Sequence, residues 1–229
     1  MNLSKRLEAV VRFIPANSRI ADIGTDHGYV PTTLIQRNIA TWAVAADMNH
    51  GPLQSAMSTI RDAGLDKQVA CREGNGLAVL TPGEVDGVLV CGMGGALIRD
   101  ILASQPAVTA QLQFLVLQPM TGAAVLRRYL AATGWRIADE ALVIEEPRLY
   151  EIIYAIPHVP YALEEWEYEV GPVNWQKQSI ALDRHIRQCI EKKDHILEGL
   201  RKGGETNSER YDTVRRGKII LEEKLCRCY

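Results

Sequence analysis

The chain has 229 residues, of which 47% are hydrophobic and 24% are charged, with 18 glycines and 10 prolines. This composition excludes a disordered chain, a collagen-like chain and a disulfide-dense mini-protein. The formal net charge of −2 is unevenly distributed. Residues 1–172 carry 13 basic and 19 acidic side chains, whereas residues 173–229 carry 13 basic and 9 acidic. A mildly acidic body is therefore followed by a basic tail.

The N-terminal segment and the cysteines bear on where the protein works. Residues 3–14 place apolar side chains at helical spacing, and charges interrupt them before a signal peptide could form. No apolar run approaches transmembrane length. The five cysteines lack the spacing of a secreted framework or of a zinc site. Cys226 and Cys228 are either a terminal redox or metal pair or two incidental thiols. We expect a soluble, cytoplasmic protein without a metal.

Between residues 19 and 156, short apolar runs alternate with helical patterns, as in β-α units. The runs are mostly Val, Ile, Leu and Ala without polar alternation, which is typical of parallel strands covered on both faces. This pattern predicts a Rossmann-like α/β sheet of seven strands. No helix separates the last two runs, so we expect an antiparallel pair at the sheet edge. The runs are 19–23, 42–46, 68–71, 87–91, 113–117, 141–144 and 151–156.

The pattern changes over residues 157–172, where prolines and four glutamates break the β-α rhythm. We therefore expect a catalytic domain over 1–160 and a second domain over 161–229. Beyond the break, two amphipathic stretches flank Gly203-Gly204, and a lysine fills one heptad step in each. They predict an antiparallel helical hairpin close to a coiled coil, although one long helix dimerising with a second chain also fits. The apolar positions are Leu182, Ile186, Cys189, Ile196 and Leu200, then Tyr211, Val214, Leu221 and Leu225.

The segment from Asp22 to Tyr29 lies where the first strand turns into the first helix. Its Gly24 and Gly28 allow a sharp turn and leave room for a ligand at the end of the strand. The spacing differs from the dinucleotide fingerprint, and Asp22 and Asp26 would repel a pyrophosphate. A ligand with cationic and hydroxyl groups but no phosphate fits better, and S-adenosylmethionine is such a molecule.

Two further strand ends carry polar residues. Asp47 follows the second strand, 23 residues beyond Gly24, where a carboxylate can bind ribose hydroxyls. A helix cap or turn residue is the other interpretation of Asp47. Asn75-Gly76 follows the third strand and is either a contact for an adenine ring or a plain Asn-Gly turn.

The fourth strand runs into Cys91-Gly92-Met93-Gly94-Gly95. Each glycine carries an entropic cost, so three in four positions indicate backbone packed against a ligand. The fifth strand ends in Gln118-Pro119-Met120. Gln118 can both donate to and accept from the edge of a base, although a buried side chain that caps the next helix is an equal alternative.

Four strings in this order, followed by a helical hairpin, resemble the bacterial tRNA (adenine(22)-N(1))-methyltransferase family. They are Asp-Ile-Gly-Thr-Asp-His-Gly-Tyr-Val-Pro, Gly-Asn-Gly, Gly-Met-Gly-Gly and Leu-Gln-Pro. The resemblance covers nearly the whole chain. It implies a class I methyltransferase domain that uses S-adenosyl-L-methionine, and a C-terminal coiled-coil-like domain. It also implies tRNA as substrate, with methylation of N1 of adenine 22.

The resemblance carries the family's cofactor site onto matching positions. These are Asp22, Gly24, Asp26, His27, Asp47, Met48, Asn75, Gly76, Cys91, Gly92 and Met93. Met120 stands where the family more usually has Asn, which weakens any hydrogen bond from this position to the base.

The position of Asp26, His27 and Tyr29 makes them the candidate catalytic residues. Adenine N1 bears no proton at neutral pH, so methyl transfer needs alignment and desolvation rather than a general base. Asp26 is expected to stabilise the cationic product, and His27 and Tyr29 to stack on the base or bind its amino group. N1 is blocked in a paired base, so the target adenine must be unpaired or flipped out.

The basic tail is the candidate tRNA-binding surface, because lysines and arginines can follow phosphates. A solvated coiled-coil surface is the alternative, and two further functions stay open. These are methyl transfer to another RNA, a small molecule or a protein, and a non-catalytic docking module. We expect a monomer, with a weak dimer still possible. The candidate RNA-binding residues are Arg184, Arg187, Lys192, Lys193, Arg201, Lys202, Arg215 and Arg216.

Overall fold

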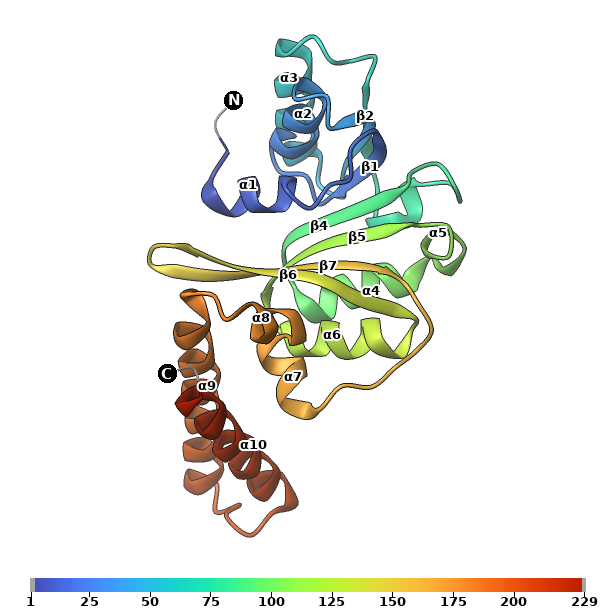
Figure 1. The fold of residues 1–229 in the computed structure, drawn as a ribbon. Coiled ribbons are helices and arrows are strands. Elements are labelled where there is room, and N and C mark those ends of the chain that lie inside the picture. The colour runs from blue at the N-terminus through green and yellow to red at the C-terminus, as the bar shows by residue number, and fades with distance from the viewer. Residues whose placement is uncertain (1–2, 228–229) are drawn as a thin grey trace.

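The computed structural model describes residues 3–227 and contains one seven-stranded sheet with helices around it (Figure 1). The strands are β1 (Ser18–Ile23), β2 (Ala40–Asp47), β3 (Val69–Glu73), β4 (Gly87–Gly94), β5 (Phe114–Thr121), β6 (Trp135–Glu145) and β7 (Arg148–Pro157). The first helices are α1 (Lys5–Val11), α2 (Tyr29–Gln36), α3 (His50–Asp62), the 3₁₀ turn η1 (Gly76–Val79), α4 (Gly95–Ser104), α5 (Pro106–Thr109) and α6 (Ala123–Ala132). The C-terminal helices are α7 (Glu165–Val170), α8 (Pro172–Lys177), α9 (Ala181–Lys202) and α10 (Glu209–Cys226).

The sheet has the order β3-β2-β1-β4-β5-β7-β6. The first five strands along the chain pair in parallel, and β7 runs antiparallel to both β5 and β6. This arrangement confirms the predicted Rossmann-like sheet with one antiparallel strand. The strand order reverses between β1 and β4, and ligands of open α/β sheets bind at such a switch point.

Helices cover both faces of the sheet, as the unbroken apolar runs require (Figure 1). On one face, Ile20 of β1 packs with side chains of α1, α2 and α3. On the other face, the next residue, Ala21, packs with side chains of α4 and α6. Both residues are fully buried, so the strand has no polar face and reads as a continuous apolar run.

The β6–β7 pair is a long ribbon that extends past the rest of the sheet (Figure 1). The sequence predicted only residues 141–144 of β6, because its first half interleaves polar side chains with apolar ones. The tip of the ribbon contacts two helices. The Glu145 side chain accepts from the Lys5 N–H of α1 at 3.1 Å, and the Glu146 side chain accepts from Arg184 of α9 at 2.7 Å. The ribbon therefore links α1 to α9.

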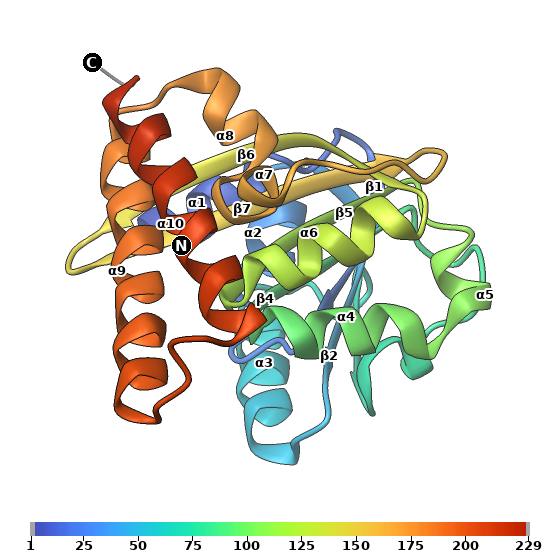
Figure 2. The same cartoon turned by 90° about the horizontal axis from the view of Figure 1, so that it is seen from below.

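The C-terminal helices form the predicted hairpin, in which α9 and α10 lie side by side (Figure 2). A small second core joins the hairpin to α7, and it consists of Trp166, Val170, Leu182, Ile186, Cys189 and Leu221. One predicted seam position is wrong. Ile196 is 42% exposed and Leu197 is buried, because the helix turns through 100° per residue and the seam drifts from an ideal heptad by this point.

The two lysines that interrupt the predicted seam form ion pairs instead of packing. Lys193 binds Glu169 at 2.6 Å, and Lys218 binds Asp194 on the facing helix at 2.7 Å.

A separate set of ionic contacts is buried between α6, the sheet and α7. Arg127 of α6 donates to Glu140 at 2.7 Å and to Glu151 at 2.6 Å. Its Nη1 also donates to the Tyr168 carbonyl oxygen at 3.0 Å, which fixes α7 against the sheet.

In the described part of the chain, no helix has the length and apolarity needed to cross a bilayer. Residues 3–227 also contain no group of three or more His, Cys, Asp or Glu side chains arranged to hold a metal ion. Cys226 is exposed and reduced, and Cys228 lies outside the described residues.

Candidate active site at the carboxyl ends of β1 and β4

A pocket of about 530 Å³ opens where β1 and β4 end, at the switch point of the sheet. It is formed by α1, by the loop from β1 into α2 and by the glycine-rich end of β4. Eight predicted site residues line it: Asp22, Gly24, Asp26, His27, Tyr29, Cys91, Gly92 and Met93. The structure thus brings together two motifs that are separated by more than 60 residues in the sequence.

The loop after β1 is held by backbone hydrogen bonds. The N–H groups of Gly24 and Thr25 both donate to the Ala46 carbonyl oxygen, at 2.8 and 2.9 Å. Gly24 has φ of +80°, and a Cβ at this position would lie 2.1 Å from the Met93 methyl carbon. The Met93 methyl group, which is the movable end of its side chain, packs on the glycine, and the left-handed φ is what favours glycine at this position. The Thr25 hydroxyl is buried next to the Asp22 carboxylate.

Asp22 is the most buried carboxylate in the pocket, with 7% of its surface exposed. Burial raises its pKa from 3.8 to about 6, the nearby Thr25 side chain opposes this, and the charge of Asp47 adds to it. No described residue forms an ion pair with Asp22. A cationic ligand group at this position would stabilise the ionised form.

Asp26, His27 and Tyr29 form an exposed cluster at the pocket. The His27 Nε2 lies 3.4 Å from an Asp26 carboxylate oxygen, and the His27 and Tyr29 rings stack with 5.1 Å between their centroids. The Asp26 side chain is 75% exposed and Tyr29 is 41% exposed. These side chains are accessible to a second substrate that enters from solvent.

The remaining predicted cofactor residues lie beside this pocket but do not line it. Asp47 ends β2 and accepts from the Asn49 N–H at 2.7 Å, while Met48 is 64% exposed. Asn75 precedes η1, and Gly76 has φ of +55° with Ile101 packed against it. Asp47 pairs in register with the last residue of β3, so these groups occupy the next strand ends along the same edge.

The sequence did not reveal that Arg6 belongs to this site. Arg6 of α1 lines the pocket, and its Nη1 donates to the Gln118 side-chain oxygen at 2.5 Å. Its guanidinium also lies over the Tyr150 ring, 5.4 Å from the centroid. No local motif marks Arg6, because its partners lie more than 110 residues away; only its place on the polar side of an amphipathic helix could have drawn attention to it.

Gln118 is fully buried and has its own partners. Its side-chain oxygen accepts from Gly92 N–H at 3.1 Å as well as from Arg6, and its amide nitrogen donates to the Pro119 carbonyl oxygen. The suggested contact with a base is therefore wrong for this arrangement, and so is the helix cap. Gln118 instead connects the end of β4 to the end of β5. Burial also raises the pKa of the Cys91 thiol, so Cys91 is neutral in the pocket wall.

The eight basic residues predicted to bind RNA are distributed along α9 and α10. Arg184, Arg187, Lys193 and Lys202 form ion pairs within the chain. Lys193 is the least accessible, with 13% of its side chain exposed. The others have different surroundings: Lys192 lines a second pocket, Arg201 contacts Tyr211, and Arg215 and Arg216 are exposed on α10.

Comparison with known proteins agrees with this geometry. A family model described as "Methyltransferase domain" matches residues 3–153. The chain is 36% identical over 155 residues to the tRNA (adenine(22)-N(1))-methyltransferase of Bacillus subtilis, an alignment that covers 68% of this chain. The same alignment spans 65% of that relative, which is just under two thirds of its length.

Two solved structures extend the similarity to the hairpin. The B. subtilis m1A22 tRNA methyltransferase TrmK has a TM-score of 0.89 and 28% identity, covering 98% of this chain and 99% of that one. M. capricolum TrmK, solved with S-adenosyl-homocysteine, has a TM-score of 0.83 and 27% identity, covering 97% of both chains. The resemblance expected from the sequence is confirmed, and the chain belongs to the methyltransferase family that includes these tRNA (adenine(22)-N(1))-methyltransferases.

Proposed function

We propose that the protein transfers a methyl group from S-adenosyl-L-methionine to N1 of adenine 22 in tRNA. The observation that carries this proposal is the acidic, glycine-walled pocket at the switch point of a fold that matches TrmK structures over its whole length. The Bacillus subtilis relative is named as a methyltransferase of this nucleotide.

The residues present fit S-adenosyl-L-methionine. The pocket and the adjacent strand end present carboxylates, Asp22 and Asp47, which suit an ammonium, a sulfonium and ribose hydroxyls and disfavour phosphates. A Cβ at Gly92 would meet no atom within 4 Å, so there is open space against the backbone.

Each half of the site would hold one part of the cofactor. Arg6 is the guanidinium in the pocket and would bind the amino-acid carboxylate, while Asp22 would face the ammonium. Asp47 would accept from the ribose hydroxyls, and Asn75 would bind the adenine amino group. When bound, the cofactor supplies an electrophilic methyl group on a sulfonium.

The protein's task in the reaction is alignment. Adenine N1 has a lone pair in the ring plane and no proton at neutral pH, so no residue has to act as a base before transfer. His27 and Tyr29 would stack on the target base, because their rings already lie parallel and exposed beside the pocket. The Asp26 carboxylate would stabilise the positive charge that the base acquires.

The hairpin would hold the tRNA. Its exposed Arg215 and Arg216 can contact phosphates directly, and the surface pairs of Arg187 and Lys202 can exchange a carboxylate for a phosphate at little cost. We also propose that the chain acts as a monomer in the cytoplasm, since α10 already covers the apolar seam of α9. The division into domains over 1–160 and 161–229 remains a proposal.

The decisive experiment is incubation of the protein with tRNA and methyl-labelled cofactor, followed by nucleoside mass spectrometry and site mapping. We expect 1-methyladenosine at position 22 and no product with a transcript in which that adenine is replaced. Methylation elsewhere would overturn the nucleotide assignment. Failure to bind S-adenosyl-L-methionine in a titration would overturn the enzymatic function.

A further inference from the structure

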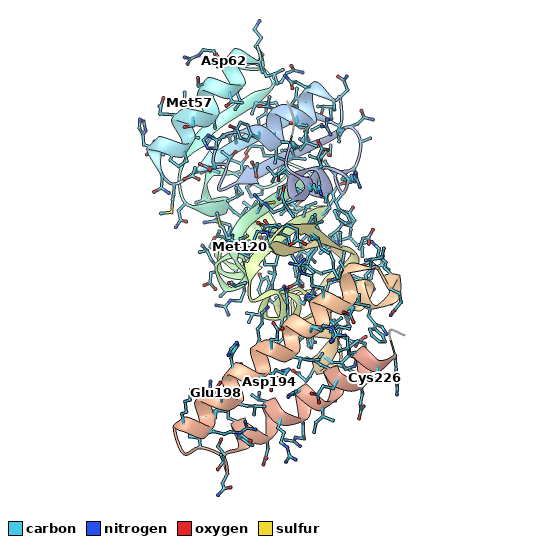
Figure 3. The ribbon with its side chains drawn as sticks, turned by 90° about the vertical axis from the view of Figure 1, so that its left-hand side faces the viewer. Met57, Asp62, Met120, Asp194, Glu198 and Cys226 are labelled. Carbon is cyan, nitrogen blue, oxygen red and sulfur yellow. The ribbon has the colours of Figure 1, made fainter. Side chains whose placement is uncertain are left out.

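A second pocket, of about 180 Å³, lies between the end of β5 and helix α9. It is separate from the pocket described above and shares no lining residue with it. Its walls come from three parts of the fold: the segment from Pro119 to Ala124, the β7 residues Leu149 and Glu151, and the helical residues Glu169, His185, Gln188, Cys189 and Lys192. Figure 3 shows Met120 in the middle of the molecule, with Met57 of α3 above it and the hairpin below it. The cavity holds about six waters at ~30 Å³ each, and so it suits one small planar group.

One buried polar group in this pocket lacks a hydrogen-bond partner among the described residues. His185 is 2% exposed, its Nε2 accepts and donates no hydrogen bond there, and the Glu151 carboxylate lies 3.6 Å from it. That carboxylate is held by Arg127, which donates to its Oε2 at 2.6 Å. Gln188 is half-buried in the wall of the cavity, so its amide is accessible to a ligand. A buried ring nitrogen is normally satisfied, so the His185 Nε2 indicates a ligand with a polar group of its own.

The side chains of the lining select the kind of ligand. Glu151 and Glu169 are already paired, with Arg127 and Lys193, so neither leaves an uncompensated negative charge in the cavity. Met120, Leu149 and Cys189 provide apolar walls. An imidazole, an amide and apolar walls together match the edge and faces of a nucleobase, and the exposed Lys192 suits a phosphate of the same strand.

One side chain, Gln118, lies between this second pocket and the first pocket and is hydrogen-bonded to both walls. Gln118 accepts from Gly92, which lines the first pocket, and donates to Pro119, which lines the second. The second pocket also lies against α9, which carries six of the eight basic residues of the proposed tRNA-binding surface. One of them, Lys192, belongs both to that surface and to the lining of the cavity.

We propose that this second pocket binds an unpaired base of the tRNA other than the methylated adenine. The proposal rests on the proposed function. The base fixes the strand at the junction of hairpin and sheet, so that the target adenine is presented to the first pocket. Gln188 and His185 read the edge of the bound base.

The test uses the full-length protein with substitutions at Gln188, which lines the pocket and is half-buried. For Gln188→Ala and the similarly sized Gln188→Leu, we expect KM for tRNA to rise about tenfold, as for loss of one base contact. The kcat and the affinity for S-adenosyl-L-methionine should stay within twofold of wild type. Glu191→Gln, on the exposed part of the same helix, is the matched control and should change neither parameter. An unchanged KM for both Gln188 variants overturns the proposal.

A second measurement identifies the base. Transcripts with single substitutions at unpaired nucleotides near the target adenine are assayed with wild type and with Gln188→Ala. One position should raise KM for the wild type and have no further effect in the variant, because the contact is already lost. If every substitution acts equally on both proteins, no base occupies the pocket. If the wild type itself methylates no tRNA, the proposed function fails instead, so the two failures are distinguishable.

Discussion

At the scale of single residues, the site contains a carboxylate, Asp22, whose ionised form is disfavoured by burial. Asp22 is buried beside Asp47 with no cation of the described chain paired to it, and burial with this neighbour raises its pKa to about 6. Such a residue is placed for a ligand rather than for stability. Gly24 is a second residue suited to the site, because its left-handed φ of +80° is one that residues with a side chain rarely adopt.

Asp22→Asn should therefore stabilise the ligand-free protein and destroy its ability to bind the cofactor. The gain is at most about 3 kcal/mol at pH 7.5, because a pKa raised by about two units costs about that much to the ionised form. Thermal unfolding measures the stability, and calorimetric titration measures the binding. A variant that unfolds at a lower temperature than wild type would show that Asp22 has a structural role.

The raised pKa of Asp22 also predicts how cofactor affinity depends on pH. A cationic ligand binds the ionised carboxylate, so affinity should be full above pH 7 and should fall as the pH drops through about 6. The loss should approach tenfold per pH unit below that value. Titrations between pH 5 and 8 measure it, and a flat profile would exclude Asp22 as the ammonium partner.

Gly24→Ala should weaken cofactor binding by at least tenfold. A Cβ would lie 2.1 Å from the Met93 methyl carbon, and φ of +80° strains any other residue. Gly51→Ala is the control, since a Cβ there meets nothing within 4 Å. Comparable affinities for the two variants would show that the loop adapts to the extra methyl group.

At the scale of elements, the hairpin and the sheet are joined through a buried ionic network. Arg127 of α6 binds Glu140 of β6, Glu151 of β7 and the backbone of α7. Glu140 in turn accepts from the N–H groups of Val173 and Asn174 at the start of α8. One guanidinium thus fixes the helices that carry the hairpin.

Arg127→Met should reduce the free energy of unfolding by about 3–5 kcal/mol, because it leaves two carboxylates without their cation in the interior. The neighbouring Arg128→Met is the matched control. Arg128 pairs with Glu165 at the surface, where such a pair contributes about 1 kcal/mol or less. Urea unfolding of both variants tests this, and similar losses would contradict the assignment of the network.

At the scale of the whole molecule, the net charge of −2 is the sum of an acidic body and a basic C-terminal region with different proposed roles. Binding of tRNA should depend on the hairpin, whereas binding of the cofactor should depend on the acidic pocket. The pocket beneath α9 lies at the boundary between these two parts.

The double variant Arg215→Glu, Arg216→Glu should reduce tRNA affinity at least tenfold and flatten its dependence on salt. Affinity for S-adenosyl-L-methionine should not change, because both residues are exposed on α10 and neither lines the first pocket. Arg99→Glu on α4 of the sheet domain is the control. Unaltered tRNA binding by the double variant would place the RNA elsewhere.

The strands, the loop after β1 and the two C-terminal helices follow from the sequence alone, because each of these depends on residues that are close together in the chain. Strands buried on both faces appear as unbroken apolar runs, and loops that need a left-handed backbone carry glycine, so the sheet and the residues from Asp22 to Tyr29 could be predicted. The heptad pattern likewise predicted α9 and α10, although it placed Ile196 in a seam that Leu197 occupies.

Only the tertiary structure decided which distant residues meet. Arg6 reaches Gln118 across 112 positions, and Arg127 of helix α6 neutralises carboxylates on two strands, β6 and β7. The second pocket combines side chains from β5, β7, α7 and α9, none of which belongs to a motif shared with the others. Such contacts arise from packing between elements, which depends on the shapes of whole surfaces and leaves no periodic signal in the sequence.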